Sequence, residues 1–157
     1  MLQGRVTCVE STGAYGLWRK FNATNLPYYG WTNQLNYNYY SGGTWGQTPV
    51  SQNNYYVAFY IFATNNKIEP IISIQGQRED SSLDNARNNN NPNTLILTDF
   101  PTKEAKLLYR IILKYNSSYT NNPYRCRIED VTDYRNQFVS TGSIIGGTGT
   151  VTYVALS

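Results

Sequence analysis

The sequence predicts an all-β protein, and the prediction comes from its composition and from hydrophobic runs of strand length. Tyrosine contributes 15 residues, and aromatic residues make up 15% of the 157-residue chain. Charged residues also make up 15%, below the roughly 25% of typical domains. Aromatic and β-branched residues favour strands, whereas asparagine and glycine favour turns. We therefore expect an antiparallel β-sandwich with one or two short helical turns.

Length and charge limit the classes of protein to which the chain could belong. A chain of 157 residues is long enough to bury a core, so residues 1–157 are expected to form a single β-sandwich domain. The net charge is +3, and the basic residues do not cluster. We therefore expect no nucleic-acid partner. No apolar run reaches the about 18 residues of a membrane-spanning helix, so no membrane insertion is expected.

The residue types that most enzymes and metal sites need are scarce. The chain has no histidine, which removes the Ser-His-Asp and Cys-His nucleophile systems and the commonest metal ligand. Glu79, Asp80 and Asp84 could be paired carboxylates or calcium ligands, but neighbouring carboxylates in a loop are usually only solvated. We expect no enzyme activity, no cofactor and no metal. Cys8 and Cys126 are interpreted as buried hydrophobes or free thiols, and whether they meet in a disulfide stays open.

The chain is organised around a hairpin in residues 55–77. Residues 55–64 are nearly all aromatic or β-branched, which indicates a strand. Asn65 and Asn66 tolerate turn geometry, and residues 68–77 supply the antiparallel partner. The first run does not alternate between polar and apolar residues, so we expect both of its faces to be buried. One source of the second cover is another copy of the same chain.

The segments on either side of this hairpin predict further strands. Residues 5–9 and 14–21 are expected to pair, and residues 105–115 and 124–131 are expected to form later strands. Residues 22–54 form an aromatic, Asn- and Gly-rich region. Because a long structureless loop is unusual in a compact domain, this region either holds short strands, with Trp45 on one of them, or is a functional loop.

Several local predictions complete this scheme. Ser81 or Ser82 is expected to cap one helical turn, with Leu83 and Ala86 facing inward. Residues 94–98 are predicted to form a short strand, and residues 130–135 a turn of helix. Ile128 is predicted to face inward from the outer strand. Residues 150–156 are predicted to form the last strand.

Two structural roles follow from residues in unusual places. Arg110 lies in an otherwise apolar strand and needs a carboxylate partner, for which Asp130 and Asp133 are the candidates. Gly76 and Gln77, at the end of the second hairpin strand, indicate a bulge or tight bend.

The aromatic region of residues 22–54 suggests a sugar-binding surface. Aromatic faces stack on the apolar faces of pyranose rings, and Asn, Thr and Tyr side chains hydrogen-bond to hydroxyl groups. The alternative is that several of these residues pack inside the domain or in a subunit contact. The candidate residues are Tyr28, Tyr29, Trp31, Tyr37, Tyr39, Tyr40 and Trp45.

Residues 55–135 contain an ordered set of motifs that resembles the distal (head) domain of bacteriophage tail fibres and receptor-binding proteins. The motifs are an aromatic strand (residues 56–61), a Gly-Gln strand end (residues 76–77), a Ser-Leu-x-x-Ala turn (residues 82–86), a Leu-Tyr-Arg-Ile-Ile strand (residues 108–112) and a late Asp-Tyr-Arg (residues 133–135). The family's usual tyrosine before the Ser-Leu turn is replaced here by residues 78–80. The resemblance implies a β-rich, typically trimeric domain of a virion tail fibre, exposed outside the host cell.

Three functions follow as expectations. The first is a non-enzymatic tail-fibre domain, assembled as a homotrimer, that holds a host-surface glycan or protein. Weak sites on three copies would then give avidity. The second is a trimerisation or structural module without receptor binding. The third is a polysaccharide depolymerase, against which the missing histidine argues.

Overall fold

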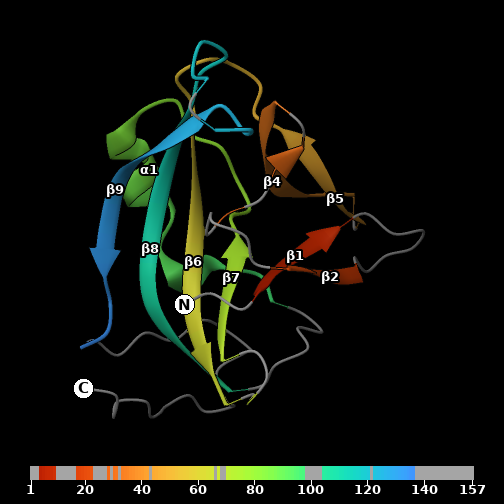
Figure 1. Cartoon of the computed structure of the whole chain (residues 1–157), viewed down its shortest axis with the longest axis vertical. Helices are drawn as coiled ribbons and strands as arrows, with labels where there is room; N and C mark the ends of the chain where they lie inside the picture. The colour runs from red at the N-terminus through yellow and green to blue at the C-terminus, as the bar shows by residue number, and fades with distance from the viewer. Residues whose placement is uncertain are drawn as a thin grey trace.

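A computed structural model describes residues 4–9, 17–22, 28, 30–31, 33–42, 44–65, 67, 70–97, 104–120 and 122–136 of the chain. Strands dominate this part, which confirms the all-β prediction (Figure 1). The strands are β1 (Gly4–Val9), β2 (Leu17–Asn22), β3 (Gly30–Trp31), β4 (Gln34–Ser41), β5 (Thr44–Pro49), β6 (Tyr56–Thr64), β7 (Ile71–Gln75), β8 (Ala105–Tyr115) and β9 (Cys126–Asp133). The helical elements are α1 (Leu83–Asn89) and the 3-10 turn η1 (Pro92–Thr94).

The strands form two sheets. One has six strands in the order β2-β1-β7-β6-β8-β9, and the other has three in the order β3-β4-β5. Neighbouring strands are antiparallel, except that β1 runs parallel to β7. The predicted central hairpin is β6 and β7, and β1 and β2 form the predicted N-terminal pair. Residues 22–54 hold the short strands β3 to β5, with Trp45 on β5.

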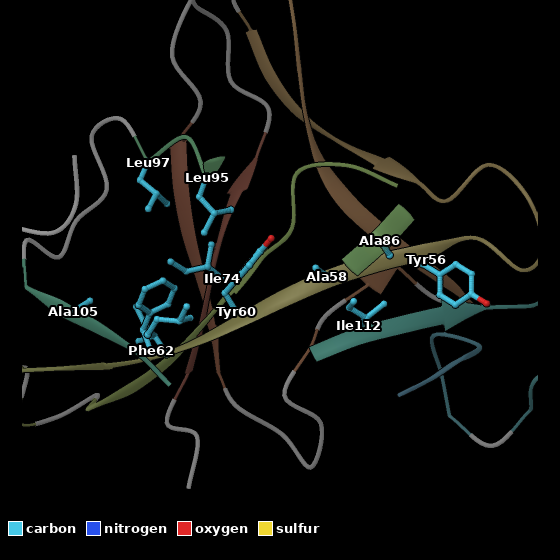
Figure 2. Close-up of a cluster of buried hydrophobic side chains, with 12 residues drawn as sticks. Tyr56, Ala58, Tyr60, Phe62, Ile74, Ala86, Leu95, Leu97, Ala105 and Ile112 are labelled. Carbon is cyan, nitrogen blue, oxygen red and sulfur yellow. The ribbon is translucent and has the colours of Figure 1, made fainter. Parts of the chain in front are cut away.

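One face of β6 packs against the helix and the segment that follows it. Tyr56, Ala58, Tyr60 and Phe62 alternate along β6 and are all buried in one apolar cluster. Ala86 of α1 and the leucines at positions 95 and 97 belong to the same cluster, and Figure 2 shows them gathered over these β6 side chains. As predicted, Ser82 caps α1, because its side chain accepts a hydrogen bond from the backbone N–H of Asn85.

The opposite face of β6 packs against the small sheet. Val57 and Phe59 are buried in a second cluster with Leu35 of β4 and Ile111 of β8. Cys126 of β9 belongs to this cluster as a free thiol with no exposed surface, and burial raises its pKa to about 12. Figure 1 shows α1 on the β8–β9 side of the view and the β4–β5 hairpin on the other side.

The chain therefore supplies both covers of β6 itself. Phe59 is 0% exposed and Ile111 is 4% exposed, while Ile61 is half-buried. A second copy is therefore not the source of the cover for Phe59 and Ile111, because Leu35 of the small sheet and the flanking Tyr28 and Val50 bury them within one chain. A trimer stays a proposal that rests on the resemblance alone.

Three local predictions are wrong. Of the predicted strand 94–98, residues 94–97 lie in the described part and do not form a strand, since η1 ends at Thr94 and residues 95–97 continue without strand pairing. Residues 130–135 do not form a helical turn, because β9 continues to Asp133. Ile128 is 47% exposed. Ile128 pairs with Leu113 in the same register in which Cys126 pairs with Tyr115, and the register shift at Glu129 comes only after it. Ile128 therefore lies on the same side of β9 as Cys126, and its exposure reflects its place on the strand that ends the sheet in the described part of the chain.

Two further expectations concern the last strand and membrane insertion. The predicted last strand, residues 150–156, lies outside them. Among the helices in the described part of the chain, none is long and apolar enough to span a membrane.

Gly76, just after β7, lies close to the backbones of β6 and β4. A Cβ atom at this position would lie 2.2 Å from the carbonyl oxygen of Ala58 on β6. The carbonyl of Gly76 accepts a hydrogen bond from the backbone N–H of Asn38 on β4 (2.8 Å). Glycine thus allows the end of β7 to approach β6 and the small sheet closely.

We expect Gly76→Ala to lower the free energy of unfolding by about 3 kcal/mol, the upper end of the range for overpacking, because the clash is with backbone. Urea unfolding measures this change. The matched control is Gly42→Ala: Gly42 has a φ of +60° and open space around it, so only the left-handed conformation should cost stability, about 1 kcal/mol. Equal losses in the two variants would contradict the close approach at Gly76.

Candidate ligand-binding cleft

A cleft of about 530 Å³ opens between β4, the residues after β7 and the segment after α1. This volume lies within the roughly 300–1,000 Å³ typical of small-molecule sites. The lining residues come from segments far apart in the sequence. They are Tyr37, Tyr39, Tyr60, Gln77, Arg78, Glu79, Asn89, Asn90, Thr94, Leu95 and Ile96.

Strand β4 contributes two tyrosines to the cleft. Alternate residues of a strand share a face, so Leu35, Tyr37 and Tyr39 lie on the same side of β4. Leu35 is fully buried in the core and anchors this face, whereas Tyr39 is 47% exposed. Burial raises the pKa of Tyr37 to about 12, helped by the neighbouring charge of Glu79 and a hydrogen bond to it. Tyr37 therefore stays neutral at physiological pH.

Buried amides fix the β4–β5 hairpin to the large sheet. The Gln47 amide donates to Asn38 Oδ1 (2.5 Å) and to Gln75 Oε1 (2.7 Å). Gln75 of β7 donates in turn to the carbonyl of Asn36 (2.9 Å). Asn36, Asn38 and Gln75 have no exposed surface, so losing one partner would leave a buried polar group unsatisfied. These bonds set the position of Tyr37 and Tyr39 relative to β7.

Asp80 fixes the other side of the cleft. Its carboxylate accepts hydrogen bonds from Arg78 Nη2 (2.8 Å), Asn89 Nδ2 (2.9 Å) and Asn90 Nδ2 (3.0 Å). Its backbone N–H and carbonyl pair with those of Tyr56 at the start of β6. Asp80 is only 5% exposed, so its charge is stabilised by these donors rather than by water. The residues after β7 and the end of α1 are thereby tied to one carboxylate.

Gln77 holds the segment that carries Ile96. Its Nε2 donates to the carbonyl of Ile96 (2.7 Å), and its Oε1 accepts from the Ile96 backbone N–H (2.9 Å). These two bonds hold the backbone at Ile96, in a segment (residues 95–97) that does not pair as a strand. Leu95 is buried in the core and Ile96 is 45% exposed, so the fixed backbone presents Ile96 to the cleft.

Arg110 binds the C-terminal end of α1, next to the cleft residue Asn90. It is 6% exposed, and its Nη1 donates to the carbonyls of Arg87 (3.0 Å) and Asn90 (2.9 Å). A cation at this end of a helix is favourable, because the last carbonyls carry partial negative charge. Asp130 lies 3.9 Å from Arg110 Nη2.

Asp133, the other candidate partner of Arg110, is paired elsewhere. It binds Arg135 at 2.7 Å, and hydrogen bonds from Arg135 hold its pKa below the usual range. Arg110 therefore forms the predicted ion pair with Asp130, while its shorter bonds are to the two carbonyls at the α1 terminus.

The structure brings together only part of the predicted sugar-binding set. Tyr37 and Tyr39 meet in the cleft. Tyr28 is 4% exposed and packs in the core, with its ring centroid 6.1 Å from that of Phe59. Tyr29 lies outside the described residues, as do the side chains of Tyr40, Trp31 and Trp45, whose backbones lie on β4, β3 and β5.

The carboxylates at positions 79, 80 and 84 each bind different partners. Glu79 accepts hydrogen bonds from the backbone N–H (2.8 Å) and the hydroxyl (2.7 Å) of Ser51. The Asp84 side chain is 87% exposed and bonds to Arg87. Within the described ranges, no group of three or more Cys, Asp or Glu side chains is arranged to hold a metal ion.

Several cleft residues were missed by sequence reasoning. Arg78, Asn89 and Ile96 were not among the candidate binding residues, and Ile96 was assigned to a strand. The available signal was Ile96 itself, an aliphatic residue a few positions after an asparagine-rich run. Gln77 was expected only as part of a bend. The arrangement as a whole can bind a ligand, since it offers aromatic, aliphatic and amide groups on a fixed frame.

Comparisons with known proteins add no assignment: no protein-family model, curated protein or solved structure matches this chain.

We expect Asp80→Asn to lower the free energy of unfolding by about 1–3 kcal/mol, because the new amide group would face the donors of Asn89 and Asn90 and lose the pairing with Arg78. Urea denaturation of the purified domain measures the loss. Asp84→Asn is the matched control: Asp84 lies in the first turn of α1 and pairs with Arg87, but its side chain is 87% exposed, so the free energy of unfolding should fall by no more than about 0.5 kcal/mol. If the two variants were equally stable, Asp80 would not hold the cleft wall.

Proposed function

We propose that this chain is a non-enzymatic receptor-binding domain of a bacteriophage tail fibre, and that its cleft holds a glycan of the host-cell surface. The observation that carries the proposal is that Tyr39 and Ile96 line the same cleft. Both are large apolar residues with nearly half of their surface exposed, 47% and 45%, and both line a cavity whose remaining walls are largely polar.

This combination suits a sugar better than most other ligands. A pyranose ring has an apolar face, which fits an aromatic ring, and hydroxyl groups at its edge, which fit amide groups. The wall offers such a group from Asn89, which is exposed, whereas the amide of Asn90 is buried and bonds to Asp80 and Ala86. Because hydrogen bonds and packing already hold the side chains of these walls in place, ligand binding would cost little conformational entropy.

The segments that carry the resemblance support the same proposal. The Ser-Leu-x-x-Ala turn forms α1, whose Ala86 is buried against β6. The Leu-Tyr-Arg-Ile-Ile segment belongs to β8, and its Arg110 binds the end of that helix. Tyr134 of the Asp-Tyr-Arg motif packs against the same apolar cluster. The motifs therefore meet around one part of the core, next to the cleft, as expected for a set that acts together.

A homotrimer in the virion is part of this proposal. Three copies at the tip of a fibre would present three clefts to one cell surface, so weak single sites would bind with high avidity. The clusters on both faces of β6 are buried within one chain, so assembly would use other surfaces.

We expect Tyr39→Ala to weaken binding to the host glycan about tenfold, because an aromatic contact is worth up to about 1.5 kcal/mol beyond its buried area. A glycan array and a whole-cell binding assay with the purified domain measure the loss, and thermal melting checks the fold. Tyr119→Ala is the control, since Tyr119 packs on Arg127 at 4.1 Å and does not line the cleft. Unchanged binding in Tyr39→Ala, or equal losses in both variants, would contradict a glycan site in this cleft.

A structural module without receptor binding is the second candidate, and β9 favours it. This strand ends the six-stranded sheet in the described part of the chain. It exposes Ile128 at 47% and Val131 at 55%, which gives it an apolar outer strip. Under this candidate, the wild-type domain would bind no glycan and no cells in the same assays.

A further inference from the structure

We infer that the cleft selects a neutral saccharide that carries a methyl group, and that Ile96 is the residue that recognises this methyl group. The methyl group belongs to a 6-deoxy sugar or to an acetamido substituent, since the two share this chemistry. The inference rests on the proposed glycan-binding function and deepens it by naming the class of sugar.

The charges of the cleft favour a neutral ligand. Arg78 is bound to Asp80 through both Nε and Nη2. Glu79 accepts two hydrogen bonds from Ser51 and another from Tyr37. Each charge of the wall therefore has its partner inside the protein. Arg78 and Glu79 line the same cleft, so a carboxylated or an amino sugar would meet a like charge beside an opposite one that is already paired. The attraction gained would then not offset the cost of desolvating the sugar's charge.

The position of Ile96 supplies the methyl contact. Single exposed aliphatic residues are common on protein surfaces and need no explanation. Ile96 differs because both its backbone N–H and its carbonyl are bonded to Gln77, and because Leu95 beside it is buried in the core. Its side chain is therefore held at the cleft in advance. A fixed aliphatic group that shares a cleft with an exposed tyrosine matches a sugar with one apolar substituent.

Asn89 supplies polar recognition beside this contact. Its Nδ2 donates to Asp80, so the orientation of its amide is set by a buried carboxylate. The amide oxygen can then accept a hydrogen bond from a sugar hydroxyl. A neutral, hydroxyl-bearing ligand uses this group without disturbing the network of Asp80.

The test is an NMR titration of the intact domain with matched sugars. The pairs are L-fucose with L-galactose, L-rhamnose with L-mannose, and N-acetylglucosamine with glucose, and the charged probes are glucuronic acid and glucosamine. We expect at least one methyl-bearing sugar to bind about fourfold more tightly than its parent, the effect of burying one methyl group. Whether the deoxy or the acetamido member gains identifies the source of the methyl group.

Variants at Ile96 make the test specific. Ile96→Ala should abolish the fourfold preference while the parent sugar still binds, and Ile96→Val should keep most of it. Ile128→Ala is the matched control, because Ile128 is 47% exposed on β9 and does not line the cleft. It should leave the preference unchanged.

The outcomes separate this inference from the function on which it rests. Binding that depends on Tyr39 but shows no methyl preference, or that favours glucuronic acid or glucosamine, would overturn the inference and leave the glycan site standing. A preference that survives Ile96→Ala would also overturn it. If none of these sugars binds to the wild-type domain, both the inference and the glycan site fail.

Discussion

Burial of β6 on both faces is the constraint on which the rest of this structure depends. Its side chains alternate between two apolar clusters, so the strand needs a cover on each side. The segment after β7 supplies one cover, as α1 and residues 95–97, and the small sheet before β6 supplies the other. The small sheet directly precedes the β6–β7 hairpin in the chain, and α1 with residues 95–97 directly follows it. Neither cover therefore requires a second molecule.

Polar networks hold each cover in place and thereby shape the cleft. On one side, the amides of Asn38, Gln47 and Gln75 join the small sheet to β7. On the other side, Asp80 and Arg110 bind the end of α1 from two directions. Apolar packing has little directional preference, whereas hydrogen bonds specify one arrangement. The position of the cleft, between the edges of the two covers, follows from these bonds.

Much of the fold could be predicted from the sequence because local signals specified it. The run of residues 55–64 marked the central strand, and Ser82 with Ala86 marked the helix. The failures were at places where distant contacts decide. Ile128 is exposed on the strand that ends the sheet in the described part of the chain, a position that only the pairing of β9 with β8 reveals. Residues 95–97 are held by Gln77 rather than by a neighbouring strand, and a β-rich stretch of sequence does not reveal that difference.

The candidate site was only half predictable for the same reason. Tyr37 and Tyr39 stood out because aromatic rings stack on the apolar faces of sugars. Tyr28 carried the same local signal, yet it lies in the core beside Phe59. Arg78, Asn89 and Ile96 join the cleft through tertiary contacts with Asp80 and Gln77. A residue's type indicates what it can bind, but the chain's long-range pairing decides which residues meet.

The central claim is that one chain covers its own buried strands, and the dependence of stability on protein concentration tests it most directly. A protein that needs a second copy to fold becomes more stable as its concentration rises. Urea unfolding of the domain over about a hundredfold range of concentration measures this linkage. The account predicts that the domain stays folded, with one midpoint, at every concentration at which its solution mass is that of a single chain; assembly of the proposed trimer at higher concentration would only add to this stability. Unfolding of the domain when it is diluted to a single chain would contradict the account, because part of the cover of β6 and β8 would then come from another molecule.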